Sequence, residues 1–243
     1  MSTQLRVAVI SDIHGNLGAL RAVLADIDAR GRFDHVIVAG DHCLNGPDPD
    51  ATLDLAMERG SVLLKGNTDR DIVEEGASDP EIGDKKRASI AWTREQLGTE
   101  RIAVLDRLQF DTPVVAPDDT ELLVVHANPL NLDDHIFPDM EDDQLEQLVG
   151  NAQASVLVFG HLHIPNHRSF RSLQLFNIAS VGLPRDGDRR AVWGSFEWST
   201  QEGWTGTIHR TAYDVADTVL RILESGMPHT ERRIRDVVRA TYD

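Results

Sequence analysis

Cysteine is almost absent from this sequence, since Cys43 is the only one in 243 residues. A lone thiol excludes an intrachain disulfide framework and a cysteine-rich zinc module. Long apolar runs are also missing, and no stretch approaches the roughly 18 to 20 residues that a membrane-spanning helix needs. The apolar stretch near the N-terminus stops at Ser11 and Asp12, unlike a secretory signal. We therefore expect a cytoplasmic protein that does not enter a membrane.

Basic residues are in the minority, with 24 Lys and Arg against 40 Asp and Glu, so the formal net charge is −16. Such a chain repels polyanions, and we expect neither broad nucleic-acid binding nor attachment to anionic membranes. Hydrophobic residues make up 41%, which is enough to fill a core. No internal repeat, low-complexity tract or linker divides the sequence. We therefore expect residues 1–243 to form a single domain.

Short apolar runs alternate with helical patterns in the first third of the sequence. Strands are predicted at 7–10, 36–39 and 62–64, with helices from Leu17 and Asp50 between them. This order is typical of a parallel or mixed sheet covered by helices. Further helices are predicted at 85–97, 100–108, 141–149, 213–225 and 230–241. Further strands are predicted at 122–125, 156–159, 166–170, 173–178, 191–198 and 203–211, which together favour two sheets in one domain.

Residues that can bind metals follow five of the predicted apolar strands. They are Asp12 and His14, Asp41, Asn67, His126, and His161 with His163. In open α/β sheets, ligands bind beyond the carboxyl ends of the strands, so this coincidence indicates a site. A second Asp-x-His triplet, Asp133 to His135, follows no strand, and we interpret it as a solvated loop. Glycines precede Asp41, Asn67 and His161, and we expect them to allow sharp turns with positive φ.

The candidate ligands are two Asp, one Asn and four His, with no thiolate. This donor set suits Mn²⁺, Fe, Zn²⁺, Ni²⁺ or Co²⁺ better than Ca²⁺ or Cu(I). Seven residues are too many for one tetrahedral ion but sufficient for two ions that share a carboxylate. Two ions can clamp the attacking and leaving oxygens of a phosphoryl group, and their charge attracts an anion despite the acidic chain. We expect two divalent transition-metal ions per chain, with Mn²⁺ favoured.

The blocks around these residues resemble those of calcineurin-like metallophosphoesterases, and most closely the small bacterial and archaeal phosphodiesterase branch. The matching blocks are Asp12-Ile13-His14, Gly40-Asp41, Gly66-Asn67-Thr68-Asp69, His126 and Gly160-His161-Leu162-His163, with further likeness in Gly46 to Pro49 and Ser180 to Asp186. The resemblance implies an α/β fold, a four-layer α/β/β/α sandwich of two mixed sheets.

The resemblance also implies roles for the ligands. Asp12, His14 and His163 would hold one ion, Asn67, His126 and His161 the other, and Asp41 would bridge the two. A metal-bound hydroxide would attack phosphorus in line, with Asp41, Asn67 and His126 as catalytic residues. Asn45, Arg70, Ser180 and Arg185 lie in the adjoining loops and are candidate substrate contacts, although surface ion pairs would explain the two arginines equally simply.

Three positions depart from the family pattern. Thr68 stands where the fullest pattern has the histidine thought to protonate the leaving group, so the proton donor is open. His42 follows Asp41 where an apolar residue is usual; it would either support the ligands or be exposed, and we favour exposure. Ala179 alters a turn, which suggests a changed pocket wall. We expect Asp69 to orient a ligand or shape a turn.

The expected function is metal-dependent hydrolysis of phosphodiesters or nucleotide phosphoanhydrides in small phosphorylated substrates. The alternatives are a phosphomonoesterase, including a protein Ser/Thr phosphatase-like activity, and a non-catalytic scaffold, because this fold also serves as one in a vesicle-trafficking complex. Scaffold relatives tend to lose metal ligands, whereas all seven are present here. The sequence leaves open the natural substrate, the physiological metal and whether the chain forms a homo-oligomer.

Overall fold

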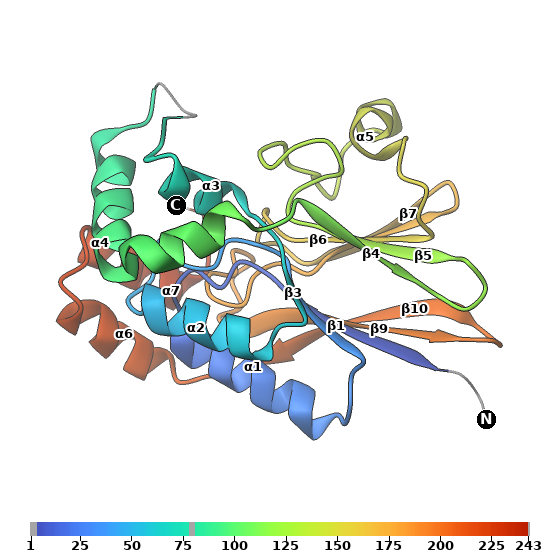
Figure 1. Ribbon diagram of the computed structural model, residues 1–243, viewed down its shortest axis with the longest axis horizontal. Coiled ribbons are helices and arrows are strands. Elements are labelled where there is room, and N and C mark those ends of the chain that lie inside the picture. Colours follow the sequence, from blue (N-terminus) through green and yellow to red (C-terminus); the bar gives the residue numbers. More distant parts are fainter. Residues whose placement is uncertain (1–3, 78–80, 243) are drawn as a thin grey trace.

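The computed structural model describes residues 4–77 and 81–242, and two mixed five-stranded sheets lie face to face in it (Figure 1). The first sheet has the order β10-β9-β1-β2-β3 and the second the order β4-β5-β6-β8-β7. The strands are β1 (Leu5–Ile10), β2 (His35–Val38), β3 (Val62–Leu63), β4 (Asp111–Val115), β5 (Glu121–Val125), β6 (Val156–Phe159), β7 (Asn166–Phe170), β8 (Leu173–Asn177), β9 (Ala191–Ser199) and β10 (Gly203–Thr211).

Helices cover the outer faces of both sheets, which completes the four-layer α/β/β/α arrangement expected from the sequence (Figure 1). In the view shown, α5 lies over the second sheet and α1 with α2 under the first, while α4, α6 and α7 gather at one end of the sandwich. The helices are α1 (Leu17–Ala29), α2 (Pro49–Arg59), α3 (Asn67–Val73), α4 (Asp84–Asp106), α5 (Asp142–Val149), α6 (Val215–Glu224) and α7 (Thr230–Arg239). Among the described residues, no helix is long and apolar enough to span a membrane.

The alternation of side chains along β1 builds two cores at once. Val7 and Val9 pack between the sheets, against residues of β5, β6 and β8 such as Val124. Ala8 and Ile10 point the other way and pack against α1. Because both faces of β1 are buried, a polar functional residue can be placed only beyond its end.

The parallel strands bring the candidate ligands to one edge of the sandwich. β1, β2 and β3 run parallel in the first sheet, and β5, β6 and β8 in the second. Their carboxyl ends therefore deliver the loops at 11–16, 39–46, 64–67, 126–128 and 160–165 to the same end of the fold.

Several predicted elements differ in detail from the structure. The strand β4 and the helix α3 were not predicted. The helices expected at 85–97 and 100–108 form the two parts of α4, which is interrupted at Gly98 with φ 67°. The two C-terminal helices are present but shorter than predicted. The polar sequence at 77–84 predicts a turn-like segment, of which residues 78–80 lie outside the described residues.

Candidate metal centre

The backbone is left-handed at five of the seven predicted ligands. Asp12, His14, Asp41, His161 and His163 have φ between 51° and 65°. This region is unfavourable for residues with a Cβ and is tolerated where surrounding structure fixes it, often at functional sites. The strain therefore marks the edge where the strands end, and it turns these side chains toward a common centre.

The three glycines before the ligands serve two different purposes. Gly40 has φ 91°, which confirms the expected turn. For Gly66 and Gly160 the expectation of positive φ is wrong, because neither has one. Instead, a Cβ on Gly66 would lie 2.1 Å from Oδ1 of Asp41, and one on Gly160 would lie 2.2 Å from Oδ2 of Asp12. These two positions need glycine because the carboxylate of Asp41 or of Asp12 occupies the space that a Cβ would need.

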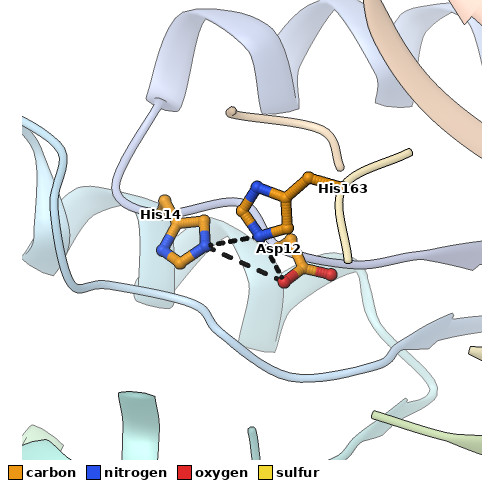
Figure 2. A group of neighbouring side chains, drawn as sticks. All are labelled: Asp12, His14 and His163. Carbon is orange, nitrogen blue, oxygen red and sulfur yellow. Dashed lines mark hydrogen bonds and ion pairs between the residues drawn. The ribbon is translucent and has the colours of Figure 1, made fainter. Parts of the chain in front are cut away.

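Asp12, His14 and His163 form one cluster of potential ligands, contributed by the loops after β1 and β6 (Figure 2). Nε2 of His163 lies 3.0 Å from Oδ1 of Asp12 and 3.2 Å from Nε2 of His14. Nε2 of His14 is 3.8 Å from the same carboxylate oxygen. All three residues are buried, so one ion could take three ligands here.

Asp41 and His126 form a second cluster with Asp12. Nε2 of His126 lies 3.5 Å from Oδ1 of Asp41 and 3.0 Å from Oδ1 of Asn67. The other carboxylate oxygen of Asp41, Oδ2, lies 3.6 Å from Nε2 of His14. Asp41 therefore faces one histidine of each cluster.

When their rings are neutral, three of the histidines present their inner nitrogens as acceptors. A backbone carbonyl can only accept, so a ring nitrogen bonded to one carries the hydrogen and the other nitrogen of the neutral ring has a lone pair. The bonds are Nδ1 of His14 to Leu44 O (2.8 Å), Nδ1 of His126 to Ala39 O (2.8 Å) and Nδ1 of His163 to Leu183 O (2.6 Å). Lone pairs of His14 and His163 thus converge on a carboxylate, an arrangement that a cation stabilises and that fits a divalent ion with nitrogen and oxygen ligands.

The buried charges perturb one another strongly. Burial alone would raise the pKa of Asp12, but His163, His126 and His14 outweigh it and hold that pKa well below the usual range. Burial raises the pKa of Asp41, with Asp12 adding to the increase and His126 opposing it. Burial and the neighbouring His163 lower the pKa of His14 to about 3. His14 is therefore neutral at pH 7, the form that binds metals.

His161 is oriented differently from the other histidines. Its Nε2 donates to the carbonyl of Asp133 (2.9 Å), and its ring packs against His126 and His135. Burial, with His126 next, lowers the pKa of His161 to about 4. His161 belongs to neither cluster of the described residues. Its role as a ligand stays a prediction, and Nδ1 is the atom that it has to offer.

Asp69 organises the turn that carries Asp41. Its Oδ2 accepts hydrogen bonds from the backbone N–H of Asp41 (2.9 Å) and of Gly66 (2.8 Å) and from Nδ1 of His42 (2.9 Å). The expectation that Asp69 shapes a turn is confirmed by these bonds. The expectation that His42 is exposed is wrong, because His42 is fully buried against this carboxylate. Both residues support the centre without belonging to its clusters.

We expect Asp69→Asn to weaken metal binding by about 10- to 100-fold, the usual cost of losing a group that orients ligands. The amide nitrogen of Asn would face N–H donors that now meet a carboxylate oxygen. Calorimetric titration of the metal-free protein with Mn²⁺ measures the effect, with the exposed Asp54→Asn on α2 as a control. Unchanged affinity in Asp69→Asn would show that the turn holds Asp41 without this carboxylate.

The four residues predicted to contact substrate are all engaged within the protein. The hydroxyl of Ser180 is fully buried, donates to Asp12 O (2.7 Å) and accepts from Leu183 N (2.7 Å), so its position does not support a substrate contact. Arg70 makes a two-pronged ion pair with Asp133 (2.7 and 2.9 Å). The other two, Asn45 and Arg185, bind residues of the C-terminal segment.

Residues after β10 reach the centre, which the sequence did not predict. Arg233 of α7 is largely buried and donates to Oδ1 of Asn45, which adjoins the carbonyl that fixes His14. The Tyr242 hydroxyl donates to Leu162 O, between the two histidines of the last block. Burial lowers the pKa of Arg233 to about 10. The C-terminal segment therefore forms hydrogen bonds with the loops next to His14 and His163.

A family model described as the calcineurin-like phosphoesterase superfamily domain matches residues 5–198. The chain belongs to this superfamily. It is thus a hydrolase that acts on phosphoric ester bonds, in a metal-dependent family, and its two clusters are the candidate metal ligands. The segment with β10, α6 and α7, including Arg233 and Tyr242, lies beyond the matched residues.

Other proteins resemble this phosphoesterase over nearly its whole length. An uncharacterized protein of Methanocaldococcus jannaschii, MJ0912, is 29% identical over 243 residues, covering 91% of this chain and 93% of its own. A metallophosphoesterase from Sphaerobacter thermophilus has a TM-score of 0.78 at 25% identity, with 98% and 99% of the two chains covered. The hypothetical protein PH1004 from Pyrococcus horikoshii OT3 shares the fold, with a TM-score of 0.82 at 21% identity over 98% and 100% of the chains.

Proposed function

We propose that this protein hydrolyses phosphodiester or nucleotide phosphoanhydride bonds at a centre of two divalent metal ions. The observation that best supports this proposal is the position of Asp41. Its two carboxylate oxygens lie 3.5 Å from Nε2 of His126 and 3.6 Å from Nε2 of His14, so one side chain can serve both ligand sets.

The proposed assignment follows the two clusters. Asp12, His14 and His163 hold one ion, and Asp41 is shared. Asn67, His126 and Nδ1 of His161 hold the other. Nitrogen and oxygen donors without thiolate favour Mn²⁺, with Fe, Zn²⁺, Ni²⁺ and Co²⁺ as alternatives.

When bound, the two ions make water a nucleophile near neutral pH and neutralise charge on the phosphoryl oxygens. The protein keeps the ligands in place for this chemistry. The Nδ1–H of His14, His126 and His163 are tied to backbone carbonyls, which fixes each ring and its inner lone pair. Asp69 holds the backbone of Asp41 from the opposite side.

Among the residues that the structure describes, neither Cys43 nor Ser180 is placed to act as a covalent nucleophile. Cys43 is buried, burial raises the pKa of its thiol well above the usual value, and the thiol is directed at Pro49 O. Ser180 is committed to two backbone hydrogen bonds. We therefore propose a single displacement at phosphorus, without a phosphoenzyme.

Thr68 favours substrates with good leaving groups. It occupies the first turn of α3, where its backbone N–H donates to Oδ1 of Asp41 (2.9 Å), and its hydroxyl is a poor general acid near neutral pH because its pKa lies far above that range. Aryl and nucleotide phosphate leaving groups need little protonation. This supports diesters and anhydrides over alkyl monoesters, which are the substrates of the alternative phosphomonoesterase or Ser/Thr phosphatase-like activity.

We further propose that residues 1–243 act as one unit, because the C-terminal segment bonds to loops within the family domain. The presence of all seven candidate ligands weighs against a non-catalytic scaffold. Turnover of bis(p-nitrophenyl) phosphate and p-nitrophenyl phosphate by the Mn²⁺-loaded protein distinguishes these functions, since a scaffold hydrolyses neither and a monoesterase prefers the second.

Hydrolysis of a chiral phosphorothioate diester in isotopically labelled water is expected to invert the configuration at phosphorus. One direct displacement gives inversion, whereas a covalent intermediate requires two displacements and gives net retention. Analysis of the labelled product by ³¹P NMR reads the outcome. Retention would overturn the single-displacement proposal while leaving the metal centre itself in place.

A further inference from the structure

A row of rings leads outward from the metal centre along the loop at 126–141, between β5 and α5. The ring of His135 lies 4.1 Å from that of His161, centroid to centroid, at an interplanar angle of 33°. The ring of Phe137 follows at 5.5 Å and is nearly parallel to His135, at 16°. Phe137 is 47% exposed, so the row starts at a candidate metal ligand and ends at solvent. The interpretation of Asp133 to His135 as a solvated loop holds for Asp133 and Asp134, which are exposed, whereas His135 is half-buried.

The loop holds these rings in a defined position. The buried Asn128 accepts hydrogen bonds from Leu130 N (2.8 Å) and Asn131 N (3.0 Å) and donates to Asp134 O (2.8 Å). Ile136, between the two rings in sequence, is buried in the core under α5. The Arg70–Asp133 ion pair and the His161–Asp133 hydrogen bond tie the loop to the centre. The exposed ring of Phe137 is thus presented by an anchored loop.

An anchored, half-exposed aromatic ring beside an active site has two explanations. If Phe137 served only to cover His135, a leucine would do as well, and the ring would not need to lie parallel to the imidazole. In this stacked pair one face of Phe137 is turned toward His135, which leaves the outer face of Phe137 to another ring. The acidic neighbours Asp133 and Asp134 repel an anionic group at this place but not an uncharged base.

We propose that Phe137, backed by the ring of His135, forms a stacking platform for a planar ring of the substrate, so that the enzyme prefers phosphoesters carrying a nucleobase or aryl group. The proposal rests on the proposed function, because it requires the phosphoryl group to sit at the metal centre. The platform recognises the ring by its face, so it tolerates different bases.

Binding of AMP and ribose 5-phosphate to the Mn²⁺-loaded full chain tests the platform. The two probes share phosphate and ribose and differ only in the base. We expect AMP to bind the wild type at least about 10-fold more tightly, within the range found for stacking of one base on an aromatic ring. In Phe137→Leu, which keeps apolar bulk without a ring, the difference should fall below about 3-fold while ribose 5-phosphate binds as before.

Two further variants sharpen the test. Phe137→Trp should retain or increase the preference for AMP, because it restores a ring. Leu223→Ala, which alters another exposed apolar side chain on α6, should leave it unchanged. Equal binding of the two probes by the wild type, or an undiminished preference in Phe137→Leu, would overturn the platform.

The outcomes separate this proposal from the proposed function. Efficient hydrolysis of diesters without a preference for AMP refutes the platform alone. A preference for AMP that depends on Phe137, in a protein that hydrolyses no phosphoester, supports the platform and refutes the proposed function.

Discussion

Asp41→Asn is expected to make the metal-free protein more heat-stable and, at the same time, nearly inactive. Asp41 is buried, and its pKa is raised by burial and by the charges of Asp12 and Asp69. At pH 7 its ionised form is therefore unfavourable in the folded state unless a cation is bound. Asparagine removes the charge, keeps an oxygen to accept from Thr68 N, and tolerates the left-handed backbone at φ 57°.

The direction of the Asp41 pKa shift determines how the stability difference between the wild type and Asp41→Asn varies with pH. A carboxyl group whose pKa is raised by folding binds its proton more tightly in the folded protein. Its destabilising contribution is absent below the unfolded pKa, develops as the pH rises through the folded pKa, and stays constant above it. The metal-free wild type should therefore lose stability relative to Asp41→Asn as the pH rises from acid toward neutral, and the two should converge at low pH.

Thermal melts in chelator and in Mn²⁺ measure the stability of the metal-free and the metal-loaded protein. A gain of about 1 kcal/mol would raise the melting temperature of the metal-free variant by about 2 to 4 °C, whereas added Mn²⁺ should stabilise only the wild type strongly. Loss of the shared carboxylate should lower kcat/KM by about 10²- to 10³-fold. Asp119→Asn is the matched control, because Asp119 has a similar φ of 65° but is exposed. A variant that keeps two tightly bound ions and full activity would contradict the sharing of Asp41.

Thr68→His is expected to raise the rate selectively for substrates with poor leaving groups. Thr68 adjoins the proposed ligand Asn67 and is 7% exposed, and its hydroxyl oxygen has no hydrogen-bond partner among the residues that the structure describes. An imidazole here would supply an acid close to the reacting bond. General-acid help is typically worth about 10²- to 10⁴-fold and matters most when the departing oxygen is basic.

A series of aryl and alkyl phosphodiesters measures this effect as the slope of log kcat/KM against the leaving-group pKa. The slope should be steep in the wild type and flatter in Thr68→His, with metal content equal in both. Thr68→Val, which removes the hydroxyl and keeps the shape, should retain the steep slope. A flat slope in the wild type, with chemistry rate-limiting, would mean that another residue donates the proton.

The strand ends were predictable because their signals are local. The apolar run from Val7 to Ile10 and the polar residues after it are contiguous, so the buried strand and its ligands could be located together. The same holds for Val156 to Phe159 and the histidines that follow. Parallel strands then bring such ends together without further information about the loops.

The missed elements have weak local signals. β4 contains Pro113 and Asp111, which strand propensities disfavour, and it is accommodated because it lies at the edge of its sheet. α3 begins directly at Asn67, so a block interpreted as a turn is also the first turn of a helix. Its helical geometry places Asp69 beneath the turn at Asp41, which accounts for the burial of His42.

Contacts between distant segments could not be predicted from the sequence. Ser180 and Asp12 are 168 residues apart, and Arg233 and Asn45 are 188 apart. Nothing in the local sequence distinguishes Arg233 from a solvent-facing arginine of an amphipathic helix. The role of Phe137 likewise depends on a loop path that brings its neighbour His135 against His161.

The pairing of β1 also bears on how the chain folds as it is made. β1 carries the backbone into Asp12 and His14 and lies between β2 and β9. β2 follows it closely, but β9 begins only at Ala191. At synthesis rates of about 5 to 20 residues per second, roughly 8 to 30 s separate the emergence of the two partners from the ribosome. During that interval one edge of a highly apolar strand has no native partner, and such an edge is open to wrong pairing. The strand that delivers the first ligands is therefore exposed to misfolding until the first sheet closes.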